Sequence, residues 1–224
     1  MLSRASGRLL LAVSMSLIPL LSLGSQAQGI DDIRSASVPG LSVRVDGQTG
    51  VVHYIVIQIG TRSQSDGPVV QFSEINLGGG SLVGDDWKES VKYAMTAVLR
   101  QLGIEGRNWM VTIKNRSYNA MTDGMSASGA VAVGILAAWR GGQVRPEVAM
   151  TGQITLDGKI VAVGHIPQKL EAAARERFKT VLVPRGQLQT PEWDLTALAA
   201  QRQVTVMEVG TLEEAYEAMV RGSR

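Results

Sequence analysis

Hydrophobic and polar positions along the chain follow two different periods. Runs rich in valine and isoleucine, broken by glycine, proline and Asp-Gly pairs, predict β-strands. Hydrophobic positions three and four apart predict amphipathic helices. The expected strands cover residues 41–46, 51–59, 69–77, 108–114, 148–156, 159–163, 180–184 and 204–209. The expected helices cover residues 86–102, 126–140, 167–177 and 193–202, followed by a last helix that opens at Thr211.

Residues at the ends of these helices support the boundaries. Asp86 is suited to cap the first helix and Gly103 to stop it. Thr211 and Glu214 have the spacing of a capping box. The helix over residues 126–140 has small or apolar residues on every side, which predicts a helix buried at the centre of the protein.

The order of the elements predicts a single α+β domain with a mixed sheet over residues 41–222. A hairpin around Asp157-Gly158 gives an antiparallel pair, whereas strands separated by helices give crossovers. The 224 residues, 45% of them hydrophobic, suffice for one well-packed domain and an extra segment. The polar residues 29–40, with their Pro-Gly end, are expected to form a linker.

Residues 1–28 have the composition of a signal peptide. Two arginines precede an apolar stretch over residues 9–23, and residues 25–27 offer small side chains to a signal peptidase. A cleaved signal would export the chain, to the periplasm or the extracellular space. Two alternatives stay open, which are a membrane anchor formed by residues 9–28 and a mitochondrial transit peptide.

Composition excludes several classes of function. The net charge of +2 comes from 22 basic and 20 acidic residues without a long run of one sign, and aromatic residues make up 4%, so we expect no nucleic-acid partner. The absence of cysteine excludes thiol catalysis and thiolate zinc sites. The two histidines are too few for a histidine-rich metal site, and His53 is expected to be a half-buried strand residue. We therefore expect no metal and no other cofactor.

A turn rich in small residues, at positions 123–129, leads into the expected buried helix. Ser126 would lie in the first turn of that helix, among backbone N–H groups that lack an intrahelical partner. Such groups stabilise a developing oxyanion, so Ser126 is a candidate nucleophile. The alternative is that Ser126 only caps the helix, a role in which serine is common.

Lys169 is the matching candidate for a general base. It follows Gly164-His165-Ile166-Pro167 and falls in the first turn of its own helix. The positive end of the helix dipole and burial would both lower the pKa of this lysine, toward the range in which a neutral amine accepts a proton. The alternative is a solvated surface lysine.

Several ungapped blocks resemble the proteolytic domain of the Lon family, over roughly residues 50–220. The blocks are residues 80–90, 123–138, 144–158, 161–173 and 179–184. Ser126 and Lys169 lie 43 positions apart, the separation shown by the Ser-Lys dyad of Lon. The resemblance implies the Lon-type fold, which is similar to domain 2 of ribosomal protein S5.

The resemblance also implies roles for individual residues. Ser126 and Lys169 would form the catalytic dyad, and Thr151 would hydrogen-bond the lysine amine. Asp123 would either position the loop or serve as a structural turn. The backbone donors to the oxyanion would come from Gly124, Met125 and Ser126.

Three positions near the dyad would affect the loop, the access to it or its packing. Met125 stands where bacterial relatives have proline and archaeal relatives have aspartate, which would set the loop before the nucleophile differently. His165 replaces a glycine beside the catalytic helix, which would narrow access to it. Ser128 would point to a different side of the helix from Ser126 and is expected to pack rather than react.

No Gly-x-x-x-x-Gly-Lys-Ser/Thr run occurs in the sequence, so no phosphate-binding loop is expected. Together these features predict an exported serine endopeptidase that hydrolyses peptides or unfolded protein segments without its own ATPase. An ATPase partner would be a separate protein, and the hexameric rings of Lon domains imply a homo-oligomer. Two other functions stay open: a non-catalytic peptide-binding module of the same fold, and a self-processing protease that cuts its own linker.

Overall fold

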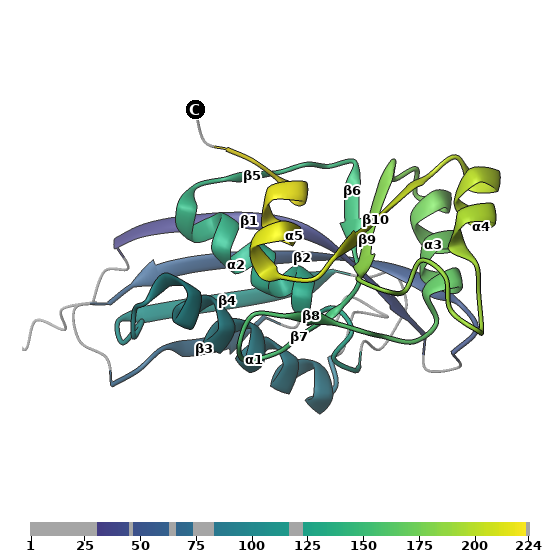
Figure 1. Ribbon diagram of the computed structural model, residues 1–224. Helices are drawn as coiled ribbons and strands as arrows, with labels where there is room; N and C mark the ends of the chain where they lie inside the picture. Colours follow the sequence, from purple (N-terminus) through teal and green to yellow (C-terminus); the bar gives the residue numbers. More distant parts are fainter. Residues whose placement is uncertain (1–30, 45–46, 63–65, 74–82, 117–122, 223–224) are drawn as a thin grey trace, which may run out of the picture.

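The computed structural model describes residues 31–44, 47–62, 66–73, 83–116 and 123–222 (Figure 1). At its centre is a seven-stranded mixed sheet with the strand order β10-β9-β6-β1-β2-β4-β3. Its strands are β1 (Asp31–Val43), β2 (Gly50–Thr61), β3 (Val69–Phe72), β4 (Trp109–Arg116), β6 (Val148–Met150), β9 (Thr180–Pro184) and β10 (Thr205–Val209). This sheet and its helices confirm the predicted α+β class.

Five helices and two small sheets complete the described part of the fold. The helices are α1 (Asp85–Leu102), α2 (Ser128–Arg140), α3 (Ile166–Arg175), α4 (Leu195–Arg202) and α5 (Leu212–Met219). The small sheets pair β5 (Gln143–Val144) with β11 (Val220–Arg221), and β7 (Gln153–Ile154) with β8 (Ile160–Val161).

β1 forms a long antiparallel pair with β2, in which Val38 lies opposite Ile55. The prediction of a linker is therefore wrong for residues 31–40, which belong to this strand. Its polar residues resemble those of a loop because several, such as Ser35 and Ser37, are exposed. Gly40 belongs to the strand for a packing reason, since a Cβ there would lie 3.1 Å from the Ile55 side chain and 3.4 Å from Ala127.

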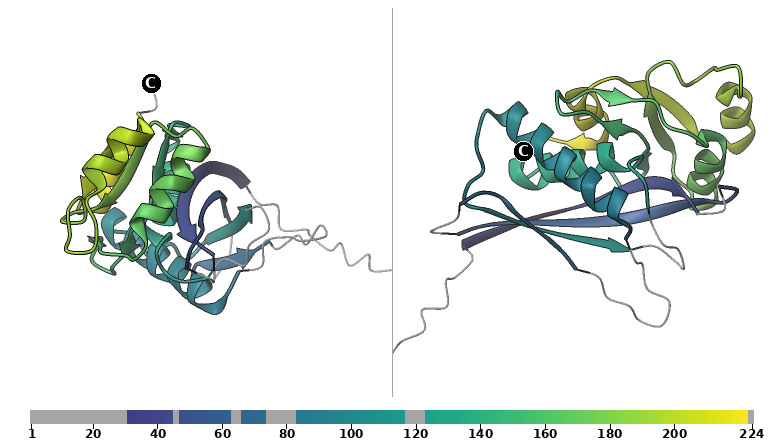
Figure 2. Two further views of the ribbon diagram at one scale, coloured as in Figure 1. Left: turned by 90° about the vertical axis from the view of Figure 1, so that its right-hand side faces the viewer. Right: turned by 90° about the horizontal axis from the view of Figure 1, so that it is seen from below.

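Alternating strand residues build two buried clusters on opposite faces of the sheet. One cluster packs Val38, Ile55 and Ile57 against α1, α2 and α5. The other packs Leu41 and Val52 against α3 and α4. Figures 1 and 2 show α3 and α4 side by side at one end of the molecule, next to β9 and β10 and away from α1. The two groups of helices therefore meet the sheet from different sides.

α2 is the buried central helix that the sequence predicts. Every residue from Ser128 to Ala138 is buried. A Cβ at Gly134 would lie 2.4 Å from Ile57 Cδ1, so the absence of a side chain lets the helix cross close to the sheet. The helix begins at Ser128 rather than at Ser126, which places Ser126 in the turn before it.

Two further predictions need correction, and two are confirmed. Asp86 does not cap α1, because Gly84 is the N-cap residue and no side chain of the cap residue bonds the helix. The hairpin around Asp157-Gly158 is shorter than predicted, because residues 148–150 instead pair in parallel with β1 and β9. Gly103 ends α1 in the left-handed conformation, and Thr211 caps α5 by accepting from Glu214 N–H.

The predicted signal peptide falls on residues 1–28, which lie outside the described residues. Within the described ranges, no helix has both the length and the apolar composition needed to cross a membrane.

Candidate active site

Ser126 is held by its own main chain rather than by its side chain. Its carbonyl oxygen accepts from Gly152 N–H at 2.8 Å and from Thr151 Oγ1 at 3.2 Å. The N-cap residue of α2 is Ala127, with no side-chain cap, so the alternative in which Ser126 only caps the helix is wrong. The half-buried Ser126 hydroxyl makes no hydrogen bond to another described side chain or backbone group. It is therefore available for chemistry.

Ser128 fastens the same turn to β7. Its hydroxyl donates to Met125 O at 2.7 Å and accepts from Ile154 N–H at 2.9 Å. The side chain is fully buried and both its donor and its acceptor functions are used. The structure thus confirms that Ser128 packs and is not a second nucleophile.

Asp123 links the serine turn to the start of α1. One carboxylate oxygen accepts from Trp87 N–H at 3.2 Å and from Gly124 N–H at 2.9 Å. Trp87 N–H is one of the first N–H groups of α1, which has no cap from its own N-cap residue. Gly84 makes room for this contact, because a Cβ there would lie 2.3 Å from the Asp123 carboxyl carbon. Asp123 therefore positions the loop by capping a helix 36 residues earlier in the chain.

Replacing Asp123 by alanine should cost about 1 kcal/mol of unfolding free energy, since it removes a helix cap and releases the serine turn. Asp123→Asn keeps an acceptor oxygen and should retain most of that stability. Urea unfolding of both variants measures their stability. The rate of peptide hydrolysis reports whether the serine turn keeps its conformation. If Asp123→Ala were as stable as the unmodified chain, the cap would not hold the turn.

The three expected oxyanion donors are not equivalent. The N–H of Gly124 donates to the Asp123 carboxylate at 2.9 Å. Across the described residues, no hydrogen bond uses the N–H of Met125 or of Ser126. These two groups lie directly before α2, where unpaired N–H groups favour negative charge.

Lys169 is buried in the first half of α3, with 2% of its surface exposed. The alternative of a solvated surface lysine is therefore wrong. Burial lowers the pKa of Lys169 from 10.5 to about 7. Within the described part of the chain, its amine has no carboxylate partner. A lysine with this pKa loses its proton near neutral pH, and a neutral amine can accept a proton.

Thr151 connects the serine turn to the face of the sheet that carries α3. Its hydroxyl approaches two carbonyl oxygens, Ser126 O at 3.2 Å and Leu41 O at 3.3 Å. The Leu41 side chain packs in the same buried cluster as Ile166 and Leu170, which lie on either side of Lys169 in α3. No hydrogen bond joins Thr151 to Lys169 among the described residues, but the hydroxyl lone pairs can still accept one.

Sequence reasoning missed a buried polar cluster on strands β1, β2 and β4. His53 is fully buried rather than half-buried, its Nε2 forms a short hydrogen bond with Ser42 Oγ, and its side chain also bonds that of Asn115. Burial lowers the pKa of His53 to about 4, against the opposing effect of the Asn115 hydrogen bond. Ser42 is only 3% exposed, so no peptide carbonyl reaches it. The cluster is structural, and the alternation of residues in β2 was its only sequence signal.

The described ranges hold no cluster of possible metal ligands. No group of three or more His, Asp or Glu side chains there is placed to hold a metal ion.

Comparison with known proteins identifies the family. Residues 70–221 match the family described as Lon protease (S16) C-terminal proteolytic domain. The chain belongs to this family. The resemblance stated from the sequence blocks is thereby confirmed, and membership of the Lon family supports a protease activity.

Individual Lon proteases align with about half of the chain or more. The Lon protease of Mycolicibacterium smegmatis is 34% identical over 149 residues, 61% of this chain and 19% of that protein. The Lon protease of Haemophilus influenzae is 38% identical over 121 residues, covering 50% of this chain and 15% of that protein. The Lon protease of Vibrio parahaemolyticus is 40% identical over 114 residues, covering 47% of this chain and 14% of that protein. The chain therefore spans less than a fifth of the length of these relatives.

Proposed function

We propose that this chain is a serine endopeptidase that hydrolyses peptides or unfolded protein segments, with Ser126 as nucleophile and Lys169 as general base. The observation that carries the proposal is the burial of Lys169 without a carboxylate partner among the described residues. An unpaired ammonium is costly to bury, so a lysine in this position is more useful as a neutral amine than as a charge. Family membership independently supports peptide-bond hydrolysis.

In the proposed reaction, the neutral amine of Lys169 takes the proton from Ser126 Oγ as this oxygen attacks the scissile carbonyl carbon. The negative charge that develops on the carbonyl oxygen is stabilised by the N–H groups of Met125 and Ser126. Lys169 then returns the proton to the leaving amine, and an acyl-enzyme forms. Attack by water, again assisted by Lys169, releases the second product and restores the serine.

The neighbouring residues are proposed to hold this arrangement in place. Thr151 and Gly152 fix the carbonyl of Ser126, and Asp123 anchors the start of the turn to α1. Thr151 can also accept a hydrogen bond from the Lys169 amine, as the family resemblance implies. The chain contains no phosphate-binding loop, so we propose that it hydrolyses short peptides without nucleotide.

We also propose that the chain is exported, on the composition of residues 1–28. The proteolytic domain then includes β1 and spans residues 31–222, rather than beginning at residue 41. Self-association into a ring is a further proposal, which the resemblance to Lon supports.

A fluorophosphonate probe should form a covalent adduct on Ser126, because only a serine activated by a nearby base reacts with such a probe at neutral pH. Tryptic mass spectrometry of the labelled chain identifies the modified residue. Labelling should increase from pH 6 to pH 8, as Lys169 loses its proton. A chain that binds peptides but resists the probe would instead be a non-catalytic peptide-binding module.

A further inference from the structure

A cavity of about 520 Å³ opens at the start of α3, beside the helical turn that carries Lys169. Its walls come from the segment that leads into α3, from Gln187 after β9, and from the residues before α4. The volume lies within the range of about 300–1,000 Å³ that is usual for small-molecule sites. The nucleophile and the general base do not line it, so it is a candidate subsite rather than the reaction centre.

Hydrogen bonds fix the wall of the cavity that Val163, Gln187 and Trp193 form. The side-chain amide of Gln187 accepts from Val163 N–H and donates to Val163 O, both at 2.9 Å. The indole N–H of Trp193 donates to Gln187 O at 2.9 Å. An aromatic face and a fixed amide are therefore in place before any ligand arrives, which lowers the entropy cost of binding.

Gln168 lines the cavity and immediately precedes Lys169. Its side-chain oxygen is buried and is not bonded to any described residue, so a ligand in the cavity does not reach it. A ligand in the cavity therefore lies beside the helix that carries the proposed base.

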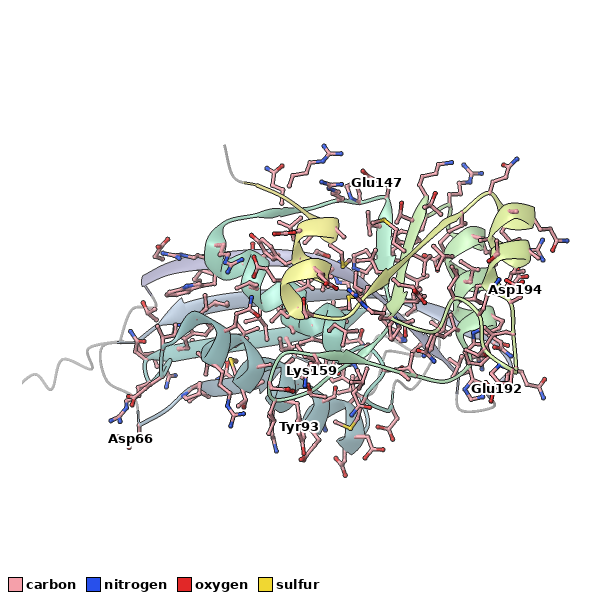
Figure 3. All side chains as sticks on the ribbon, viewed as in Figure 1. Asp66, Tyr93, Glu147, Lys159, Glu192 and Asp194 are labelled. Carbon is pink, nitrogen blue, oxygen red and sulfur yellow. The ribbon has the colours of Figure 1, made fainter. Side chains whose placement is uncertain are left out.

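The lining is also acidic. Among the described residues that line it, Glu192 is the one carboxylate, and none is a lysine or an arginine. Thr190 Oγ1 donates to Glu192 Oε2 at 3.2 Å and restrains that side chain. Glu192 is labelled in Figure 3, in the segment just before α4. The cavity therefore favours a cation and disfavours an acidic group.

His165 brings a side chain to a position that glycine would occupy more easily. Its backbone lies in the left-handed region, with φ of 58°, which costs a residue with a Cβ about 1 kcal/mol. The exposed side chain lines the cavity, next to Gly47 in the turn between β1 and β2. The histidine that replaces the family glycine thus narrows this subsite.

We propose that this cavity binds the side chain of a lysine or arginine residue of the peptide substrate. The aliphatic part of that side chain lies against Trp193, and the cationic end pairs with the Glu192 carboxylate. A hydrogen bond between a charged donor and a carboxylate is stronger than one between neutral groups. The inference rests on the proposed peptidase function, because it assigns a preference to that substrate.

Binding can be tested without turnover, in the Ser126→Ala variant. Fluorescence anisotropy would measure a set of otherwise neutral labelled peptides in which lysine, norleucine or glutamate occupies each position in turn. At one position we expect lysine to bind about 10-fold more tightly than norleucine, and glutamate more weakly than both. Equal affinities for lysine and norleucine at every position would overturn the proposal.

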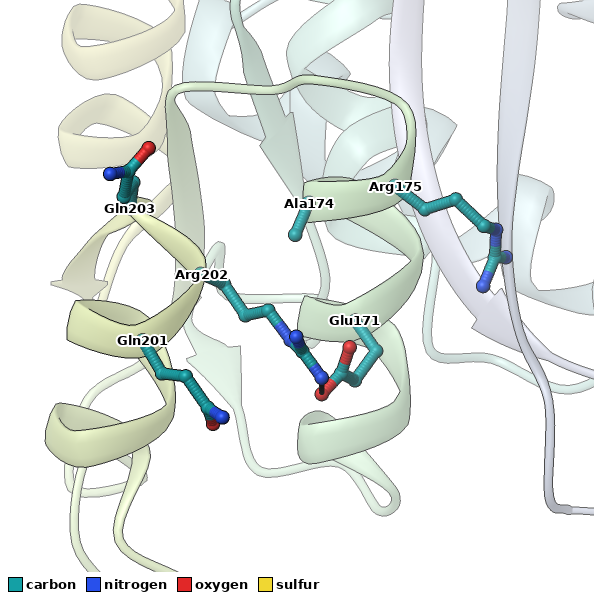
Figure 4. A pocket seen from close by; sticks show the side chains of 6 residues that line it. All are labelled: Glu171, Ala174, Arg175, Gln201, Arg202 and Gln203. Atoms are coloured by element: carbon teal, nitrogen blue, oxygen red, sulfur yellow. Dashed lines mark hydrogen bonds and ion pairs between the residues drawn. The ribbon is translucent and has the colours of Figure 1, made fainter.

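A pair of charge-neutralising variants locates the effect. Glu192→Gln, in the Ser126→Ala background, should reduce the preference for lysine to about 3-fold or less. Glu171→Gln is the matched control, because Glu171 lies on α3 in a separate pocket facing α4 and pairs with Arg202 at 2.8 Å (Figure 4). It should leave the preference unchanged. A preference that survives Glu192→Gln, or that is lost equally in both variants, would overturn the assignment to this cavity.

Failure of the peptidase function and failure of the subsite give different results. If the chain cleaves peptides and reacts with the probe but shows no preference for basic residues, the subsite is wrong and the peptidase proposal stands. If the chain neither cleaves nor reacts, while the Ser126→Ala variant still prefers lysine through Glu192, the cavity stands and the catalytic proposal fails.

Discussion

Replacing Ser126 by alanine should lower kcat for peptide hydrolysis by roughly 10⁴-fold or more, because the variant has no nucleophile for the acyl-enzyme. The fold should be unaffected, since the hydroxyl makes no hydrogen bond to another described group and the contacts of Ser126 run through its carbonyl. Steady-state hydrolysis of a fluorogenic peptide measures the loss, and circular dichroism during urea unfolding measures the stability.

Ser128→Ala is the matched control for this experiment. It removes a hydroxyl only two positions away, but one that bonds Met125 O and Ile154 N–H inside the protein. We expect it to lose roughly 1–3 kcal/mol of unfolding free energy and to retain the reactive serine. Full activity in Ser126→Ala, together with loss of the covalent adduct in Ser128→Ala, would reverse the assignment of the nucleophile.

Replacing Lys169 by methionine should abolish hydrolysis and at the same time stabilise the fold. The amine is buried, and its pKa in the folded state is lowered to about 7. In the unfolded state the amine keeps its proton up to about pH 10, so folding at lower pH has to remove this proton or bury the charge. Methionine fills a similar volume without that penalty. At pH 7 we expect the free energy of unfolding to increase by about 2–4 kcal/mol, measured by urea denaturation.

The stability gained by Lys169→Met should depend on pH. Between pH 7 and pH 10 the unfolded chain binds one more proton at Lys169 than the folded chain does, so the stability of the unmodified chain increases with pH over that interval. The advantage of Lys169→Met should therefore be largest below pH 7 and shrink toward pH 10. An advantage independent of pH would mean that Lys169 keeps an ordinary pKa in the folded state.

The pKa of Lys169 should also determine how the rate of hydrolysis depends on pH. Hydrolysis of a neutral peptide should increase through pH 7 and level off above about pH 8, where Lys169 is neutral. A histidine base would give a similar midpoint, so the shape alone does not identify the base. Lys169→Arg should be inactive because guanidinium keeps its proton, whereas His165→Ala should retain the profile. The reverse result would assign the base to His165.

The sequence by itself determined the helices and the family, and it singled out the residues that we propose to react. The period of small and apolar residues identified α2 as a central helix, and it is buried on all sides. The 43-position spacing of Ser126 and Lys169, with the flanking blocks, identified the family that the comparison confirms. These properties follow from local order in the chain, because a helical period and a family motif are both contained within short segments.

Only the tertiary structure decided how those residues are supported. The polar stretch at residues 31–40 resembles a linker until β2 supplies its partner, because strand pairing depends on a distant segment. Asp123 caps a helix 36 residues earlier, and Lys169 has a lowered pKa only because the sheet and its helices exclude water from it. The cavity beside α3 likewise joins segments that lie apart in the chain. Burial and packing are sums over long-range contacts, which no local pattern specifies.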